Sequence, residues 1–156
     1  MAVRLVAVGR VKNAHIRDSC EAYVGRIRRY VKIEIVDVRD AGRTDAAAAS
    51  ARRTEGAAIL RSIPEGAVLV ALSRAGAQET SVRFARRLER YLRDGRDVAF
   101  VIGGAHGLDE RVLQGADFTL SLSEMTLPHE IARLALLEQV YRACTIMRGE
   151  PYHKGA

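Results

Sequence analysis

The sequence predicts an α/β fold, with a five-stranded, mainly parallel sheet and helices on both of its faces. Five candidate strands alternate strictly with helical patterns along the 156 residues, which is typical of parallel sheets. Two of these strands, at residues 67–72 and 97–102, are continuous apolar runs, as expected of strands that are covered on both faces. No linker, low-complexity tract or internal repeat interrupts the pattern. We therefore expect a single domain over residues 1–156, long enough to bury its own hydrophobic core.

The elements of the N-terminal half follow from hydrophobic periodicity. An apolar run at residues 3–8 predicts the first strand, and apolar residues at helical spacing predict a helix over about 16–30. Residues 32–38 alternate between polar and apolar, which indicates a half-buried strand. An alanine-rich helix is expected over 45–63, with Asp45 as its N-cap.

The C-terminal half continues the alternation. Its predicted elements are, in order, a strand at 67–72, a helix at 80–95, a strand at 97–102, a short helix at 110–114, a strand at 117–122 and a helix at about 130–147. The chain then closes with a polar tail.

Basic residues outnumber acidic ones. Lys and Arg total 25 against 19 Asp and Glu, a formal net charge of +6, and with three lysines this leaves 25 − 3 = 22 arginines. A polyanionic partner fits this balance, and so does a base-composition bias toward arginine. Arg83, Arg86, Arg87, Arg90 and Arg93 recur at helical spacing. They form either an RNA-facing stripe or an ordinary solvated face.

Several classes of protein are disfavoured. No apolar stretch approaches the roughly 18 residues that span a bilayer, and the N-terminus lacks the pattern of a signal peptide. Cys20 and Cys144 are the only cysteines, which excludes a disulfide scaffold and fits a reducing cytoplasm. The motifs of P-loop NTPases, dinucleotide-binding enzymes and hydrolases are missing, as is the His and Cys spacing of zinc sites. We therefore expect a cytoplasmic protein with neither a membrane segment nor a metal.

Three loops are candidates for a ligand site, because open α/β sheets bind ligands at the carboxyl ends of their strands. They follow Leu72, Ile102 and Leu122. The second loop contains three glycines within residues 103–107, which either let the backbone approach a ligand closely or simply make a turn. The third, at residues 122–129, mixes hydroxyl and apolar side chains and could hold an adenine ring through main-chain groups.

The last predicted helix has apolar side chains almost all round it between Ile131 and Met147. Such a helix must be buried on every side, so we expect it to pack against a second subunit in a homodimer. Glu138 and Arg142 lie four residues apart on it. They form either an ordinary helix ion pair or, where buried, a functional one.

Four motifs taken together resemble the RlmH family of SPOUT-class methyltransferases, which act on large-subunit ribosomal RNA. They are GGAHG at 103–107, LSEMTLPHE at 122–130, the pair Glu138 and Arg142, and PYHK at 151–154. The resemblance covers essentially the whole chain and is strongest from residue 101 to residue 154.

The resemblance implies a SPOUT fold whose C-terminal part is tied in a trefoil knot, working as a homodimer. It also implies S-adenosylmethionine as cofactor and methylation of N(3) of pseudouridine 1915 in 23S ribosomal RNA within the assembled ribosome. A side chain at Gly103 is then expected to fill the space of the cofactor. The implied cofactor-binding residues are Leu72, Gly103, Gly104, Leu122, Ser123, Glu124, Met125, Thr126 and Leu127.

Methylation of N(3) requires removal of the proton on that nitrogen. His129, Glu138 and His153 are the candidate bases, and Arg142 is expected to stabilise negative charge on the uracil oxygens. Tyr152 is expected to stack on the base. The alternatives are that His129 caps the last helix and that Tyr152 and His153 belong to a frayed C-terminal tail.

Two other functions compete with methyl transfer. A non-catalytic, RNA-binding ribosome-associated factor would need the basic surface and no donor pocket, so the segment at 122–127 argues against it. An enzyme of another adenine nucleotide would need a phosphate cradle with Lys and Ser or Thr, which the sequence lacks.

Overall fold

A computed structural model describes residues 1–42 and 44–154; residues 43, 155 and 156 of the expected domain lie outside the described residues. It contains one five-stranded sheet in the order β2-β1-β4-β3-β5, and every neighbouring pair is parallel. The strands are β1 (Ala2–Val8), β2 (Lys32–Val38), β3 (Val68–Ala77), β4 (Val98–Ile102) and β5 (Phe118–Leu120). The prediction of a five-stranded parallel sheet is confirmed.

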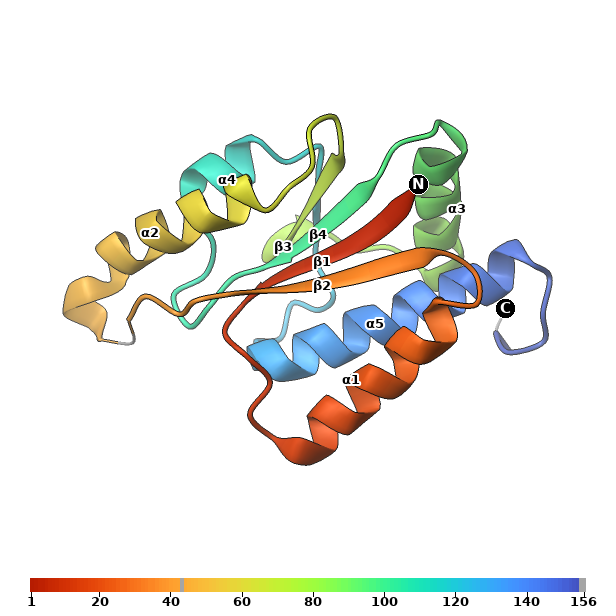
Figure 1. Cartoon of the computed structure of the whole chain (residues 1–156), viewed down its shortest axis with the longest axis horizontal. Coiled ribbons are helices and arrows are strands. Elements are labelled where there is room, and N and C mark those ends of the chain that lie inside the picture. The colour runs from red at the N-terminus through yellow and green to blue at the C-terminus, as the bar shows by residue number, and fades with distance from the viewer. Residues whose placement is uncertain (43, 155–156) are drawn as a thin grey trace.

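Helices cover both faces of the sheet (Figure 1). One face carries α1 (Ala14–Ile27), α3 (Ser81–Arg93) and α5 (His129–Met147), and both α1 and α3 pack against α5. The other face carries α2 (Ala48–Arg61) and the short α4 (Glu110–Gln114). Among the described residues no helix is both long enough and apolar enough to cross a membrane.

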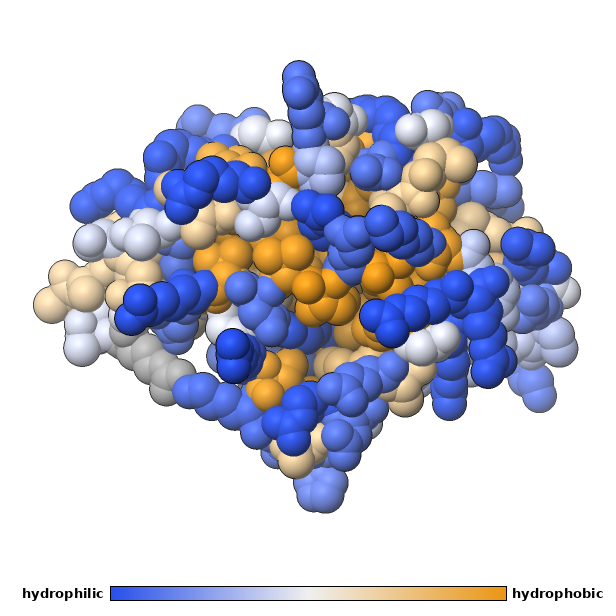
Figure 2. All heavy atoms as spheres, viewed as in Figure 1, coloured by the Kyte–Doolittle hydropathy of each residue, from blue (hydrophilic) through white to orange (hydrophobic). Residues whose placement is uncertain are grey.

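Successive side chains along a strand point to opposite faces of the sheet, so the strands contribute to two hydrophobic cores, one on each face. In β1, Val3, Leu5 and Ala7 belong to the core beneath α1, α3 and α5, whereas Val6 and Val8 belong to the core beneath α2 and α4. Figure 2 shows apolar atoms gathered at the middle of the molecule in this view, framed by hydrophilic side chains.

The structure gives a physical reason for two of the element ends that differ from the prediction. Asp45 does not cap the alanine-rich helix: it begins a single 3₁₀ turn (Asp45–Ala47), and α2 starts after Ala47 without a side-chain cap. Strand β3 continues past the apolar run because a bulge lets both Leu72 and Ala77 pair with Leu120 of β5.

Arg133 fixes the first turns of α5 to the carboxyl edge of the sheet. Its side chain is buried, with Nη1 donating to Asp37 Oδ1 at 2.8 Å and Nη2 donating to the carbonyl of Gly9 at 2.8 Å. Asp37 and Gly9 lie at the ends of β2 and β1. The contact therefore places the segment that precedes α5 beside the loops at this edge.

Candidate functional site

A cavity of about 940 Å³ lies at the carboxyl edge of the sheet. Its size falls in the range of roughly 300–1,000 Å³ that is typical of small-molecule sites. All three predicted loops line it, together with Arg52 of α2 and His129 at the start of α5. The nine residues expected to hold the cofactor all face this cavity: Leu72, Gly103, Gly104, Leu122, Ser123, Glu124, Met125, Thr126 and Leu127. The structure thus brings them together, and their role in binding stays a prediction.

The glycine loop folds tightly on itself. The N–H of Gly107 donates to the carbonyl of Gly104 at 3.1 Å, and Gly107 has a φ of 79°, a conformation that favours glycine. A Cβ on Gly103 would lie 2.7 Å from the carbonyl carbon of Gly107. The expectation that a side chain at Gly103 would fill the cofactor space is therefore wrong, because it would meet the backbone of the loop.

The main chain of residues 122–127 is largely free to bind a ligand. Within the described residues it makes two hydrogen bonds: the Ser121 hydroxyl donates to the Ser123 carbonyl at 3.0 Å, and the Met125 N–H donates to Ser123 Oγ at 3.0 Å. The other N–H and C=O groups of the segment have no hydrogen-bond partner among the residues that the structure describes. An adenine ring presents both donors and acceptors along its edge, so this donor and acceptor set fits the adenosine part of S-adenosylmethionine.

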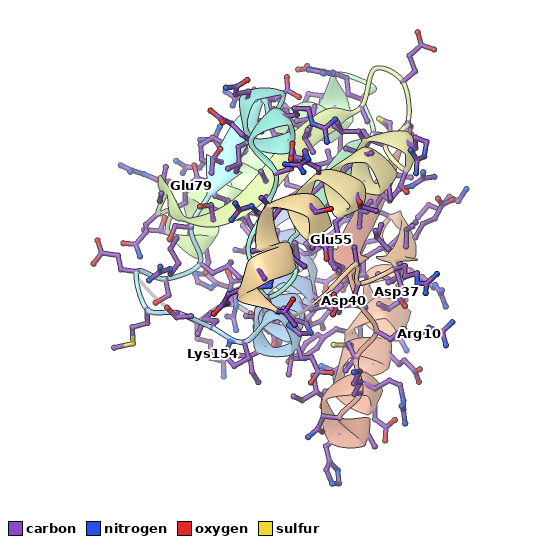
Figure 3. The ribbon with its side chains drawn as sticks, turned by 90° about the vertical axis from the view of Figure 1, so that its left-hand side faces the viewer. Arg10, Asp37, Asp40, Glu55, Glu79 and Lys154 are labelled. Atoms are coloured by element: carbon purple, nitrogen blue, oxygen red, sulfur yellow. The ribbon has the colours of Figure 1, made fainter. Side chains whose placement is uncertain are left out.

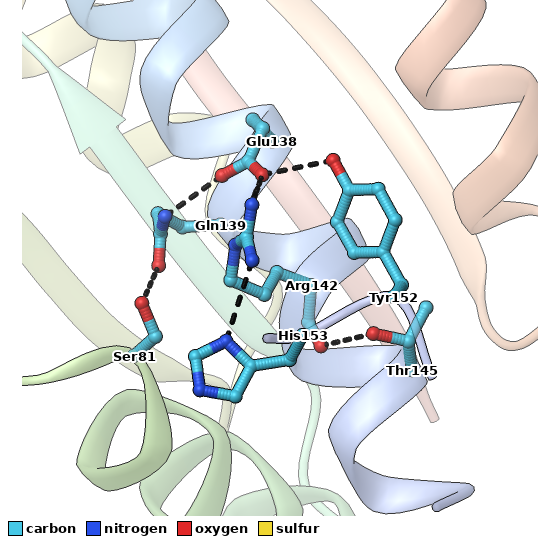
Figure 4. A network of polar contacts seen from close by, with 7 residues as sticks. All are labelled: Ser81, Glu138, Gln139, Arg142, Thr145, Tyr152 and His153. Carbon is cyan, nitrogen blue, oxygen red and sulfur yellow. Dashed lines mark hydrogen bonds and ion pairs between the residues drawn. The ribbon is translucent and has the colours of Figure 1, made fainter. Parts of the chain in front are cut away.

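A second cluster of polar residues lies on α5 and the C-terminal tail (Figure 4). Glu138 Oε1 accepts from Arg142 Nε at 3.0 Å and from the Tyr152 hydroxyl at 3.0 Å. Arg142 Nη1 is 3.3 Å from His153 Nδ1, and the Arg142 guanidinium lies 4.7 Å from the centroid of the Tyr152 ring. The structure therefore joins four of the five predicted catalytic residues, and the tail packs against α5 instead of fraying.

The same cluster continues to α3. The Gln139 side chain donates to Glu138 Oε2 at 2.7 Å, and its carbonyl oxygen accepts from the Ser81 hydroxyl at 2.7 Å. Burial and hydrogen bonds to Tyr23 and Glu138 raise the pKa of Tyr152 well above its usual value. The Tyr152 hydroxyl thus stays protonated at neutral pH and acts as a donor.

The cavity at the carboxyl edge of the sheet and this cluster lie far apart within one chain. His129 lines the cavity, but Arg142 is 13 residues further along α5, a separation of about 20 Å at the rise of an α-helix. His129 also does not cap α5, since Pro128 is the N-cap and makes no side-chain bond. Of the predicted catalytic residues, His129 alone lies at the cavity of its own chain.

A second cavity, of about 670 Å³, lies between the first cavity and the polar cluster around Glu138. It runs between α1, α3 and α5 and shares Leu122 and Leu127 with the first cavity. Ile131, 38% exposed, and the half-buried Leu134 line it together with Glu138. Helix α5, which the sequence shows to be apolar almost all round, is therefore covered on one side and open along this second cavity, which forms a groove beside it.

Comparison with known proteins settles the family. A family model described as "Predicted SPOUT methyltransferase" matches residues 1–153. The chain belongs to the SPOUT methyltransferase family. The trefoil knot remains what membership of this family implies for the C-terminal part.

Two curated relatives match this chain over their whole length. The chain is 50% identical to "Ribosomal RNA large subunit methyltransferase H" of Anaeromyxobacter sp. (strain Fw109-5), covering 99% of this chain and 100% of that protein. It is 39% identical to the protein of the same name from Acetivibrio thermocellus, again covering 99% and 100%. A solved structure titled "a probable methylase family protein" from Haemophilus influenzae Rd KW20 shares the fold, with a TM-score of 0.59 at 12% identity over 98% of this chain and 70% of that one.

One arginine of the expected stripe, Arg87, makes structural contacts within the fold. Arg87 pairs with Glu79 at 2.5 Å, and its guanidinium lies 3.7 Å from the centroid of the Phe118 ring. It thereby attaches α3 to β5 and is not part of a free basic stripe. Arg83, Arg86, Arg90 and Arg93 are exposed, and their contact with RNA stays a prediction.

Sequence reasoning missed two residues beside the cavity at the carboxyl edge of the sheet. Arg52 lines it from α2, and Glu55, one turn on, is 4% exposed behind Gly104. His106 Nε2 is buried without a partner among the described residues. Arg52 and Glu55 sit in an alanine-rich helix that carries no motif, so no signal in a single sequence separates them from surface charges. Within the described part of the chain, no group of three or more His, Cys, Asp or Glu side chains is placed to hold a metal ion.

Proposed function

We propose that this chain is an S-adenosylmethionine-dependent methyltransferase of large-subunit ribosomal RNA, acting in the cytoplasm on N(3) of pseudouridine 1915 of 23S RNA in the assembled ribosome. The observation that carries the proposal is the cavity at the carboxyl edge of the sheet, where unpaired main-chain groups of residues 122–127 face the glycine loop. The relatives' printed names support the RNA substrate. A non-catalytic RNA-binding factor would have no use for such a cavity.

In this proposal the cofactor supplies a methyl group on a positively charged sulfur, and the protein aligns that group with the nucleophile and excludes water. Leu72, Leu122 and Leu127 would enclose the adenine ring, while the main chain of 122–127 would bind its edge. No metal is required for an in-line displacement of this kind.

We further propose that the active site forms between two copies of the chain. Within one chain, Arg142 lies 13 residues beyond His129 on α5, about 20 Å along the helix axis, which is too far to reach a methyl group in that cavity. Tyr152 and His153 pack against Arg142 rather than against the cavity. The groove beside α5 is apolar along Ile131 and Leu134 and leads from the cavity to Glu138. A second copy seated in this groove would bury it and bring its own tail toward the cavity.

The chemistry then divides between the two copies. His153, or Glu138 once its contact with Tyr152 opens, would accept the N(3) proton. Arg142 would stabilise the negative charge that develops on the uracil oxygens. His129 is the candidate base from the chain that holds the donor.

Calorimetry with S-adenosylmethionine tests the donor assignment, with ATP and NAD as controls. We expect chelator-treated protein to bind S-adenosylmethionine saturably and to bind neither ATP nor NAD. Tight binding of ATP or NAD in its place would refute the assignment. Sedimentation at micromolar concentration tests the assembly: about twice the chain mass is expected, and a monomer with full activity would refute the shared site.

A further inference from the structure

One arginine near the donor cavity differs from the other arginines that are not exposed. Among the described residues five arginines are buried or half-buried, and four of them pair with a carboxylate. These pairs are Arg4 with Glu34, Arg87 with Glu79, Arg133 with Asp37, and Arg142 with Glu138. Arg52 is the fifth. Its one described bond is a long contact, 3.4 Å, from Nη1 to the carbonyl of His106.

Helix α2 holds Arg52 at the rim of the cavity. Glu55 is three residues further along but does not pair with it: Glu55 Oε1 accepts from the Ala41 N–H at 3.1 Å. Figure 3 shows Glu55 under α2, close to the loop that carries Asp40. Gly56 lets α2 approach the start of α4 closely, because a Cβ on Gly56 would lie 2.6 Å from the Cβ of Asp109. The helix thus packs on the glycine loop and on the start of α4, while Arg52 faces the cavity.

The available donors of Arg52 fit a carboxylate. A guanidinium presents its N–H groups in a planar fork that matches the two oxygens of a carboxylate. Residues 122–127, where the adenine is expected, the glycine loop and Arg52 of α2 all line this one cavity. The methionine moiety of S-adenosylmethionine ends in a carboxylate, and the Arg52 guanidinium at the rim of the cavity, which has no carboxylate partner among the described residues, offers that group a bidentate partner.

We propose that Arg52 binds the carboxylate of the methionine moiety of S-adenosylmethionine and so selects donors that carry an amino acid. The proposal rests on the proposed function, and it assigns a role to α2 that the four family-like motifs do not cover. Arg52 would then distinguish the cofactor and its product from nucleosides that share the adenosine and the sulfur alone.

Calorimetry with two ligands separates this inference from the proposed function. S-adenosylhomocysteine carries the amino acid, whereas 5′-methylthioadenosine has the same adenosine and sulfur without it. Arg52→Ala is expected to weaken S-adenosylhomocysteine binding about 10- to 100-fold, the loss of a charged hydrogen-bonding pair, and to leave 5′-methylthioadenosine binding unchanged. Arg52→Lys, which keeps the charge without the fork, should recover part of the loss.

Arg53→Ala is the matched control, since Arg53 is the exposed neighbour on the same helix and its loss changes the net charge equally. It should leave both affinities unchanged. Equal weakening of both ligands by Arg52→Ala would mean that Arg52 only supports the loop, and no weakening of either would mean that it makes no contact; both results overturn the inference while the donor site stands. An unaltered chain that binds neither ligand overturns the proposed function, and the inference with it. Thermal unfolding of each variant confirms that it folds.

Discussion

Replacing Gly103 by alanine adds a single methyl group at the point where β4 enters the glycine loop. That methyl carbon would lie 2.7 Å from the carbonyl carbon of Gly107, 2.8 Å from its oxygen and 3.0 Å from the nitrogen of Leu108. These are backbone atoms, so no flexible side chain can move aside and the loop itself must shift. Overpacking of this kind costs about 1–3 kcal/mol. For a chain of this length it corresponds to a fall in the melting temperature of about 2–12 °C.

Gly25 supplies the matched control. It lies within α1, and a Cβ there would have nothing within 4 Å. Gly25→Ala should therefore stabilise the chain by roughly 0.8–1 kcal/mol through helix propensity alone. The same substitution thus has opposite signs at two glycines, and the sign follows from the surroundings of each.

Thermal unfolding with and without S-adenosylmethionine provides the assay. Gly103→Ala should melt lower and bind the donor more weakly, because the displaced loop forms one wall of the cavity. Gly25→Ala should melt higher and bind normally. A Gly103→Ala variant with the melting temperature and donor affinity of the unaltered chain would refute the reasoning about the loop.

Three further predictions address the tail, the basic surface and the buried acid. His153→Ala should lower turnover about 100-fold in a methylation assay while donor affinity stays within about threefold, and equal loss of both would make the tail structural. Arg83→Glu with Arg90→Glu should weaken ribosome binding and flatten its salt dependence by about one unit of log–log slope per lost phosphate contact, whereas Arg87→Ala should lower stability by about 1 kcal/mol in denaturant titration. Burial raises the pKa of Glu55, so the folded chain favours the neutral acid and loses stability as pH rises above the ordinary pKa of about 4.5. Glu55→Gln should therefore gain stability relative to the unaltered chain as pH rises above about 4.5, and a stability difference that does not change with pH would contradict this.

Hydrophobic periodicity was sufficient to find the strands because helices on both faces of the sheet bury their apolar runs. The run before Leu72 predicts β3, but its extension to Ala77 depends on the register with Leu120 of β5, which is a tertiary contact. Asp45 has the right residue type for a cap, yet the chain makes a 3₁₀ turn there. Strand order β2-β1-β4-β3-β5 is likewise a property of packing and has no local signal.

The candidate site was predictable where motifs carry it and not where long-range packing does. The nine cofactor residues share one cavity because strand ends meet at one edge of a parallel sheet. The 13-residue separation of His129 and Arg142 along α5 is visible in the sequence. The sequence does not show that the cavity lies at the N-terminal end of that helix, which is why the separation puts Arg142 far from it. Arg87 resembled its neighbours in spacing, and only the position of Glu79 distinguishes it.

Mass spectrometry of 23S RNA gives the most direct test of the central claim. Ribosomes from a strain that lacks the modification would be incubated with the purified chain and S-adenosylmethionine, and the RNA fragment that contains pseudouridine 1915 would be isolated. We predict the gain of one methyl group at N(3) of that pseudouridine, dependent on the donor and formed about 100-fold more slowly by the His153→Ala variant. No methyl transfer by a chain that binds the donor, or transfer to a different nucleotide, would contradict the account.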